Sequence, residues 1–321
     1  MRTAASLPVI KDFLPLVQEV ENFLINELSE GPQSVREAAT YMAGAGGKRL
    51  RPALMLAVSR LLDVDRSKVI PMAAAVEWLH TATLIHDDII DDAELRRGKP
   101  ALYKIMGHNV SVLVGDFLYA LAIKEAVKTR KLAIIDILAE TTVKMIEGEI
   151  LALEHLCDPS MDEALYFDII TRKTAHLFAT ATTIPAHLNG SNPGQLRALK
   201  DYGTNFGIAF QMIDDMKDFT KSEAQRGKPV LQDLKEGKLT LPVLYLKKHV
   251  KGKERDALEA MMSHCDEARV DLFALVNQYD TLKDVKDLAN SYLDRARAAL
   301  TFFPDSPART ILMEAPDYIL S

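Results

Sequence analysis

The stretch Leu84-Ile-His-Asp-Asp-Ile-Ile-Asp-Asp92 places four carboxylates within six positions, directly after a largely apolar run from Ala73 to Ile85. If the segment is helical, Asp87 and Asp91 lie one turn apart on the same face, and the other two acids pair likewise. Like charges at this spacing destabilise a helix by about 0.2–0.5 kcal/mol per pair, and aspartate is a poor residue inside a helix. We therefore expect a buried helix that carries its acids into a cavity, where cations neutralise them.

A second acidic segment, Phe210-Gln-Met-Ile-Asp-Asp-Met-Lys-Asp218, follows another helical run. Asp214 and Asp218 are again one turn apart with Asp215 adjacent, and Gln211 lies one turn before Asp215. Oxygen ligands without a cluster of Cys or His favour Mg²⁺ over Zn²⁺. Mg²⁺ usually takes one or two carboxylates and completes its coordination with water and substrate phosphate. Either acidic segment alone would be a solvated helix end, but the pair predicts a site for divalent ions and phosphates.

Basic residues suited to phosphate lie close to both acidic segments. The first segment is followed by Arg96 and Arg97. It is preceded by the stretch Gly46-Gly-Lys-Arg-Leu-Arg-Pro52, which contains Lys48, Arg49 and Arg51. The second segment is followed by Lys228 and Lys238. Guanidinium groups match phosphate oxygens, and glycine amides beside cations form an anion cradle. The GxxxxGK[ST] pattern of a P-loop is absent. Acids, cations and apolar helices together predict a site for two highly anionic groups attached to hydrocarbon.

Helical patterning runs almost from end to end, and no window shows a convincing strand alternation. Ser160 with Glu163 forms a capping box, and Pro193 and Pro242 stand in first helical turns. We expect helices at about 9–29, 34–44, 52–63, 67–93, 110–127, 131–156, 161–183, 194–221, 240–250, 253–263, 268–278, 282–301 and 307–319. This predicts an all-α fold, a single-domain bundle (1–321) of about a dozen helices around a deep central cavity.

Composition narrows the class of protein further. Of the 321 residues, 48% are hydrophobic and 26% charged, and the net charge of −6 argues against a general nucleic-acid-binding protein. The first ten residues do not read as a signal peptide, and the longest apolar-looking segment, Val110 to Ile123, is too short to span a bilayer. Cys157 and Cys265 match no metal or redox spacing, so we expect free thiols in a reducing cytoplasm. Any membrane contact would therefore be peripheral.

The sequence resembles the all-trans polyprenyl diphosphate synthases from Gly46 to about Pro242, in particular the medium- and long-chain, octaprenyl diphosphate synthase-like members. The first motif of that family, DDxxD followed by RRG, stands here as Asp87-Asp-Ile-Ile-Asp91 and Arg96-Arg-Gly98. The second stands as Asp214-Asp-Met-Lys-Asp218 after Phe210-Gln211, and the GGKRxRP element is complete. The departures are slight, since Asp92 only extends the first motif.

The resemblance implies a transferase that repeatedly condenses isopentenyl diphosphate onto an allylic diphosphate. It implies about three Mg²⁺ ions per site, with Mn²⁺ as a substitute, held by Asp87, Asp88, Asp91, Asp214, Asp215 and Asp218. It assigns isopentenyl diphosphate to Lys48, Arg51, His80 and Arg97. It assigns the allylic diphosphate to Arg96, Lys173, Thr174, Gln211, Lys228 and Lys238. Lys173 and Gln211, with Asp87, Asp88, Asp91, Asp214 and Asp215, form the expected catalytic set.

The family mechanism implied by the resemblance needs no protein nucleophile. The allylic carbon–oxygen bond ionises, the isopentenyl double bond attacks the cation, and the released diphosphate accepts the lost proton. The oxygens of Thr174 and Gln211 would stabilise the cation while apolar walls exclude water. His80 alone would be a satisfied core histidine, but its position seven residues before Asp87 favours a ligand role.

The helix before the first acidic segment is expected to line the tunnel for the growing product. Ala82 and Thr83 lie five and four positions before Asp87, and at 1.5 Å per residue Ala82 is about 7.5 Å from the metals. Synthases of this family with short products tend to have an aromatic residue there, whereas Ala82 leaves the tunnel open above Leu79 and Ala75. We predict a product of about seven to ten isoprene units, C35–C50, from this position and the resemblance.

Two other kinds of function compete with this interpretation. A terpene cyclase or head-to-head synthase of the same fold would usually replace the second DDxxD and does not need the complete GGKRxRP element. A non-catalytic regulatory or partner subunit would be expected to lose acids or cradle cations. The chain retains both sets. The resemblance also implies a homodimer.

Overall fold

Helix α4 (Arg66–Ile90) is the helix around which the fold is arranged. Every residue from Met72 to Leu79 is buried, so neighbouring helices cover α4 on all sides. The helix begins where the carboxylate of Asp65 accepts a hydrogen bond from the backbone N–H of Ser67 at 2.9 Å, a standard N-cap. It packs against α1, α3, α6 and α9 and ends at the first acidic segment.

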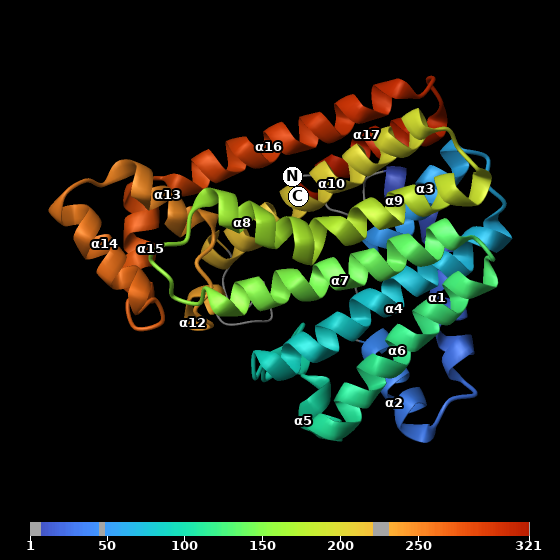
Figure 1. The fold of residues 1–321 in the computed structure, drawn as a ribbon, viewed down its shortest axis with the longest axis horizontal. Helices are drawn as coiled ribbons and strands as arrows, with labels where there is room; N and C mark the ends of the chain where they lie inside the picture. Colours follow the sequence, from blue (N-terminus) through green and yellow to red (C-terminus); the bar gives the residue numbers. More distant parts are fainter. Residues whose placement is uncertain (1–7, 45–48, 221–230, 321) are drawn as a thin grey trace.

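The computed structural model describes residues 8–44, 49–220 and 231–320 and is almost entirely helical, which confirms the predicted all-α fold (Figure 1). The first half contains α1 (Pro8–Leu28), α2 (Gln33–Gly44), α3 (Leu50–Leu61), α4, strands β1 (Leu95–Arg96) and β2 (Lys99–Pro100), α5 (Leu102–Met106), α6 (His108–Lys128) and α7 (Leu132–Glu154). The second half contains α8 (Glu163–Ile170), η2 (Thr171–Ala175), α9 (His176–Asn189), α10 (Pro193–Thr220), α12 (Gln232–Lys235), α13 (Leu241–His249), α14 (Lys253–Ser263), α15 (Arg269–Gln278), α16 (Thr281–Ala299), η3 (Leu300–Phe302) and α17 (Pro307–Leu320).

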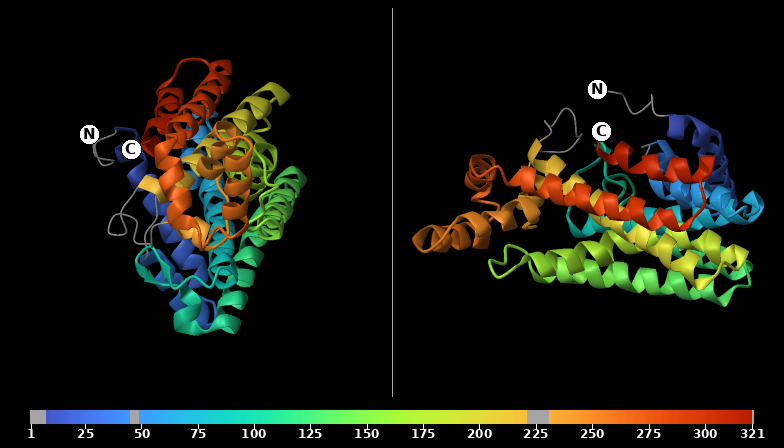
Figure 2. Two further views of the ribbon diagram at one scale, coloured as in Figure 1. Left: turned by 90° about the vertical axis from the view of Figure 1, so that its left-hand side faces the viewer. Right: turned by 90° about the horizontal axis from the view of Figure 1, so that it is seen from above.

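Helix α10, which carries the second acidic segment, packs closely against α9 and α16. A Cβ atom added at Gly207 would lie 2.6 Å from the Cα atom of Ala175, and one added at Gly203 would lie 2.7 Å from the Cα atom of Ala179. Side chains at these two glycines would therefore force the helices apart. Helices α14 and α15 form the end of the molecule that lies away from α1 and α2 (Figures 1 and 2).

The structure differs from the predicted elements in three respects. The predicted helix 161–183 is interrupted by the π-helical turn η2, and the short helices α5 and α12 were not predicted. The third difference is a β-hairpin at Leu95–Pro100, in which Arg97 and Gly98 have φ angles of 55° and 75°. A two-residue hairpin turn of type I′ needs positive φ at both central positions, which explains the glycine after the arginine pair.

The prediction of two free thiols is wrong, because Cys157 and Cys265 form a disulfide with a Cα–Cα distance of 5.6 Å. Cys157 follows the end of α7, and Cys265 lies in the turn between α14 and α15. The helical topology brings the two turns together from positions that are 108 residues apart, so no local spacing could indicate the pairing.

Breaking this disulfide should destabilise the fold. We expect Cys157→Ser to lower the free energy of unfolding by about 2–4 kcal/mol relative to the oxidised wild type, because the crosslink restricts the unfolded chain. Urea unfolding with and without dithiothreitol measures this difference. The reductant should lower the wild-type midpoint and leave that of Cys157→Ser unchanged. Two titratable thiols in the folded, unreduced wild type would contradict the prediction.

Among the described residues, no helix has both the length and the apolar composition needed to cross a bilayer.

Candidate active site

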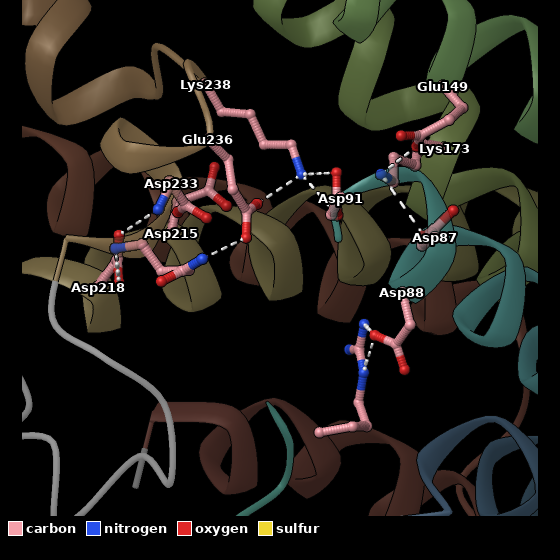
Figure 3. A network of polar contacts seen from close by, with 12 residues as sticks. Asp87, Asp88, Asp91, Glu149, Lys173, Asp215, Asp218, Asp233, Glu236 and Lys238 are labelled. Atoms are coloured by element: carbon pink, nitrogen blue, oxygen red, sulfur yellow. Dashed lines mark hydrogen bonds and ion pairs between the residues drawn. The ribbon is translucent and has the colours of Figure 1, made fainter. Parts of the chain in front are cut away.

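The C-terminal turn of α4 presents three carboxylates, and each has a basic partner (Figure 3). An oxygen of Asp87 lies 3.6 Å from the amine of Lys173. Both oxygens of Asp91 accept hydrogen bonds from the Lys238 amine at 2.9 Å. The third carboxylate, Asp88, is buried and accepts a 2.7 Å hydrogen bond from Nε of Arg96 in the hairpin. The first acidic segment is thus surrounded by cations from three separate parts of the chain.

The second acidic segment contributes one exposed and one buried carboxylate at its start. Asp214 is exposed, whereas Asp215 is buried. Asp215 accepts hydrogen bonds from the Tyr166 hydroxyl at 2.6 Å and the Gln211 amide nitrogen at 2.7 Å. The amide oxygen of Gln211 in turn accepts a 2.7 Å hydrogen bond from the Thr174 hydroxyl. Thr174 and Gln211, both assigned to the allylic substrate by resemblance, therefore belong to one network that ends on a motif carboxylate.

Asp218 has a different environment from Asp214, although both lie on α10. Its side chain is fully buried, and its two oxygens accept backbone hydrogen bonds from Gln232 at 3.2 Å and Asp233 at 2.9 Å. Those amides begin a segment, residues 231–238, that we call the strap. Metal binding by Asp218 stays a prediction, but in this structure its carboxylate fixes the start of the strap.

The strap connects the two acidic segments. Its last residue, Lys238, bonds to Asp91 on α4 and also donates a 2.7 Å hydrogen bond to Glu236. The backbone N–H of Cys157 donates to the carbonyl oxygen of Gly237 at 2.7 Å, so the disulfide lies directly against the strap. The amine of Lys238 thereby contacts the first acidic segment, while Asp218 of the second acidic segment binds the start of the strap.

Burial dominates the electrostatics of these acids. It raises the pKa of Asp87 to about 6, against the opposing effect of Lys173, and raises the pKa of Asp215 to about 7. The strap adds Asp233, whose pKa burial also raises to about 7. Although burial opposes it, the carboxylates of Asp91 and Glu236 raise the pKa of Lys238. Burial therefore makes the negative charge of these acids unfavourable unless a cation neutralises it.

These donors fit magnesium. All are carboxylate oxygens, and burial, which raises the pKa values of Asp87 and Asp215, leaves their charge poorly solvated, so that a divalent cation would stabilise it. Within the described ranges, no three His, Cys, Asp or Glu side chains are arranged to hold a metal by themselves. This arrangement suits an ion that takes one or two carboxylates and completes its coordination with phosphate and water. The residues expected to hold it stay those predicted from the sequence: Asp87, Asp88 and Asp91 on one side and Asp214, Asp215 and Asp218 on the other.

A cluster of arginines lies beside the first acidic segment. Arg49 pairs with the buried Glu77 at 2.7 Å and with Glu21 at 3.0 Å. Arg51 is buried with its guanidinium 4.3 Å from the centre of the Phe178 ring, and burial lowers its pKa to about 10. Excess positive charge of this kind attracts an anion.

His80 lies within this arginine cluster. Burial holds the pKa of His80 well below its ordinary value, and the nearby Arg51 and Arg97 lower it further. A neutral imidazole donates one hydrogen bond without adding to the charge repulsion. The structure thus brings together three of the four residues assigned to isopentenyl diphosphate; the fourth, Lys48, and Lys228 of the allylic set lie outside the described residues.

A cavity of about 270 Å³ opens beside the arginine cluster, between α1, α2, α4 and α6. Its polar end includes Arg49, Glu77 and His80, and its body is apolar, with Trp78 and Leu118 among the lining residues. None of the four predicted tunnel residues lines it; Ala75, Leu79 and Ala82 are buried in the packing of α4, and Thr83 is partly buried. The tunnel placement stays a prediction.

Several polar residues of the site were missed from the sequence. They are Tyr166 on Asp215, Glu149 on Lys173, Asp233 and Glu236 in the strap, and Glu77 on Arg49. Glu77 and Glu149 are acids in otherwise apolar helix faces, which is a usable signal. Tyr166 gave none, because a tyrosine in a helix is usually core.

Comparisons with known proteins agree with this geometry. Residues 32–279 match the family model described as Polyprenyl synthetase. The chain is 33% identical over 292 residues to octaprenyl diphosphate synthase of Escherichia coli (strain K12), covering 90% of each chain. It is 35% identical over 295 residues to geranylgeranyl diphosphate synthase of Methanosarcina mazei, again covering 90% of each.

A solved structure is similar over nearly the whole chain. This is the polyprenyl synthase of Caulobacter crescentus CB15 complexed with calcium and isoprenyl diphosphate, with a TM-score of 0.91 and 36% identity. The match covers 98% of this chain and 96% of the other. The relatives differ in the product length that their names state, so the matches show the family rather than the product. The chain belongs to the polyprenyl synthetase family.

Proposed function

We propose that the protein is a Mg²⁺-dependent transferase that condenses isopentenyl diphosphate (1′-4) repeatedly onto an allylic diphosphate to give an all-trans polyprenyl diphosphate of about C35–C50. The observation that carries the proposal is a bridge between the two acidic segments. Asp218 of the second segment binds the start of the strap, and Lys238 at the end of the strap bonds to Asp91 of the first segment. The arginine cluster beside it supplies a second anion site. Calcium and isoprenyl diphosphate in the Caulobacter protein support the same pairing of divalent cation and diphosphate.

The residues of the chain have separate tasks in this mechanism. Arg51, Arg97 and neutral His80 would hold isopentenyl diphosphate, since together they form a cationic pocket with one uncharged donor. Lys173 and Lys238 would exchange their contacts with Asp87 and Asp91 for oxygens of the allylic diphosphate. Magnesium, when bound, supplies charge neutralisation for the departing diphosphate.

The hydrogen-bonded Thr174 and Gln211 would face the allylic cation. Their side chains are fixed through Asp215 and Tyr166, so they need little reorganisation when positive charge develops. Thr174 and the adjacent Ala175 are buried, which would keep water from the cation.

Product formation tests the proposal directly. Radiolabelled isopentenyl diphosphate with an allylic primer should be incorporated into a butanol-soluble product in the presence of Mg²⁺, and chelation with EDTA should abolish incorporation. A protein that incorporates no label with any allylic primer, with or without Mg²⁺, would instead support a non-catalytic partner subunit.

Ala82→Phe is expected to shorten the product by several isoprene units, because an aromatic ring there would block the tunnel beside α4. Mass spectrometry of the dephosphorylated product measures the chain length. Thr81→Val is the matched control, since Thr81 lies on the same helix but lines the separate cavity. An unchanged chain length in folded, active Ala82→Phe would disprove the tunnel placement.

We also propose a homodimer that forms through α6 and α7. These helices carry a set of exposed apolar side chains: Val112, Leu113, Tyr119, Val127, Leu132, Val143, Ile146, Ile150 and Leu153. Helices α6 and α7 contact each other, and exposed apolar side chains gathered on neighbouring helices are typical of a protein interface. Light scattering should give twice the chain mass for the wild type and one chain mass for Ile146→Asp. A monomeric wild type at micromolar concentration would refute the proposal. We further propose a cytoplasmic localisation with peripheral membrane contact at product release. This rests on the family alone, because the disulfide removes the free thiols on which the earlier expectation depended.

A further inference from the structure

Helix α7 contributes a carboxylate to the site that belongs to neither acidic segment. The Glu149 side chain is buried and forms an ion pair with the amine of Lys173. The same amine lies 3.6 Å from Asp87, so Lys173 stands between the two acids (Figure 3). Although burial opposes it, Asp87 and Glu149 raise the pKa of Lys173. Lys173 therefore has two acidic partners: Asp87, which is a predicted metal ligand, and Glu149, which is not.

The backbone fixes the position of Glu149 relative to Lys173. A Cβ atom added at Gly148 would lie 2.7 Å from the backbone nitrogen of Lys173, so α7 contacts the turn η2 directly at this glycine. Lys173 and Thr174 of the π-helical turn η2 face the site, since Lys173 lies near Asp87 and Thr174 donates a hydrogen bond to Gln211. Turns of this type inside helices frequently occur at functional sites. The pair is thus built on two packed backbones rather than on flexible loops.

A neighbouring ion pair joins the same two elements outside the site. Arg172 of η2 pairs with Glu147 of α7 and also with Asp168. The Glu147 side chain is 40% exposed, whereas that of Glu149 is 11% exposed. Two adjacent basic residues on one turn therefore pair with two acids on one helix, and the inner pair alone reaches Asp87. A role limited to attaching α7 to η2 would be shared by both pairs.

We propose that Glu149 is a positioning residue of the allylic-diphosphate subsite, which holds the Lys173 amine at the site when Asp87 is occupied by a cation. This inference rests on the proposed function. Without Glu149, the amine would have Asp87 as its remaining carboxylate partner, and it would compete with the cation for that carboxylate. A lysine side chain also has several rotatable bonds, so an anchor already present in the free enzyme reduces the entropy lost when the diphosphate binds. Glu149 acts through Lys173 and touches no reacting atom.

The test compares Glu149→Ala with the matched control Glu147→Ala on the same helix. At saturating isopentenyl diphosphate and Mg²⁺, we expect Glu149→Ala to raise the KM for the allylic diphosphate about 10-fold and to change kcat less than about 3-fold. Calorimetric binding of a thiolo analogue of the allylic diphosphate should weaken by a similar factor. Glu147→Ala should stay within about 2-fold of the wild type in both measurements.

A double-mutant cycle separates positioning from a structural effect. In a Lys173→Ala background, the further change Glu149→Ala should weaken analogue binding by less than about 3-fold, because the residue being positioned is gone. If the losses of analogue binding caused by Lys173→Ala and Glu149→Ala instead multiply in the double variant, the inference is overturned. If circular dichroism shows that Glu149→Ala is unfolded, Glu149→Gln carries the test, since it keeps the shape and removes the charge; wild-type binding by that variant would also overturn it.

The wild-type arm keeps the two proposals apart. A wild type that makes no prenyl product refutes the proposed function. An active wild type whose Glu149 and Glu147 variants behave alike refutes the role of Glu149 alone.

Discussion

Replacing Asp87 or Asp214 with alanine is expected to reduce the rate of isopentenyl diphosphate incorporation by about 1,000-fold or more, with unchanged helical content. Asp87 has a pKa raised to about 6 by burial, so the fold holds a carboxylate where its charge is poorly solvated. A site of this kind gains from a bound cation. Steady-state incorporation at saturating Mg²⁺ measures the loss, and far-UV circular dichroism checks the fold.

The matched control for this prediction is Asp92→Ala. Asp92 extends the first acidic segment, but its side chain is 83% exposed and accepts a 2.7 Å hydrogen bond from the Tyr103 hydroxyl. Removing it should change the rate less than about 3-fold, as for most exposed surface residues. Near-normal incorporation by Asp87→Ala or Asp214→Ala would refute the metal assignment, and an equal loss in Asp92→Ala would mean that net charge matters rather than position.

The sequence predicted the helices because helical patterning runs along most of the chain and Gly and Pro mark several of the ends. The capping box expected at Ser160 was wrong, since Asp162 caps α8 by accepting a hydrogen bond from the backbone N–H of Leu165. The segment expected at 67–93 became α4 (Arg66–Ile90), and the one at 194–221 became α10 (Pro193–Thr220). Both acidic segments therefore had the right register on the right elements.

The features that the sequence did not predict depend on contacts between distant segments. Asp218 bonds to backbone amides of the strap, and a backbone amide leaves no trace in residue identity. The Cys157–Cys265 disulfide joins turns whose proximity follows from the packing of whole helices. The π-helical turn at Thr171–Ala175 was missed because it lies inside a continuous helical pattern, and one additional residue in a turn changes the periodicity of that pattern very little.

Replacing Lys238 with methionine should lower kcat/KM for the allylic diphosphate by about 100-fold, because methionine keeps most of the aliphatic stem and removes the amine. That amine bonds to both oxygens of Asp91 and to Glu236, and Asp91 and Glu236 raise its pKa, although burial opposes them. The variant would leave two acids facing each other without their cation. Steady-state kinetics at varied allylic diphosphate measures the loss.

Lys235→Met is the control for this change, since Lys235 lies on the same strap with an exposed side chain. Both variants remove one positive charge, so a general effect of net charge on an anionic substrate would appear in both. We expect Lys235→Met to remain within about 2-fold of the wild type, as exposed charges contribute little. If the two variants lose activity equally, the strap does not deliver a specific cation to Asp91. If only Lys238→Met does, the bridge between the acidic segments is functional, because that variant leaves the Asp218 contacts with the strap in place.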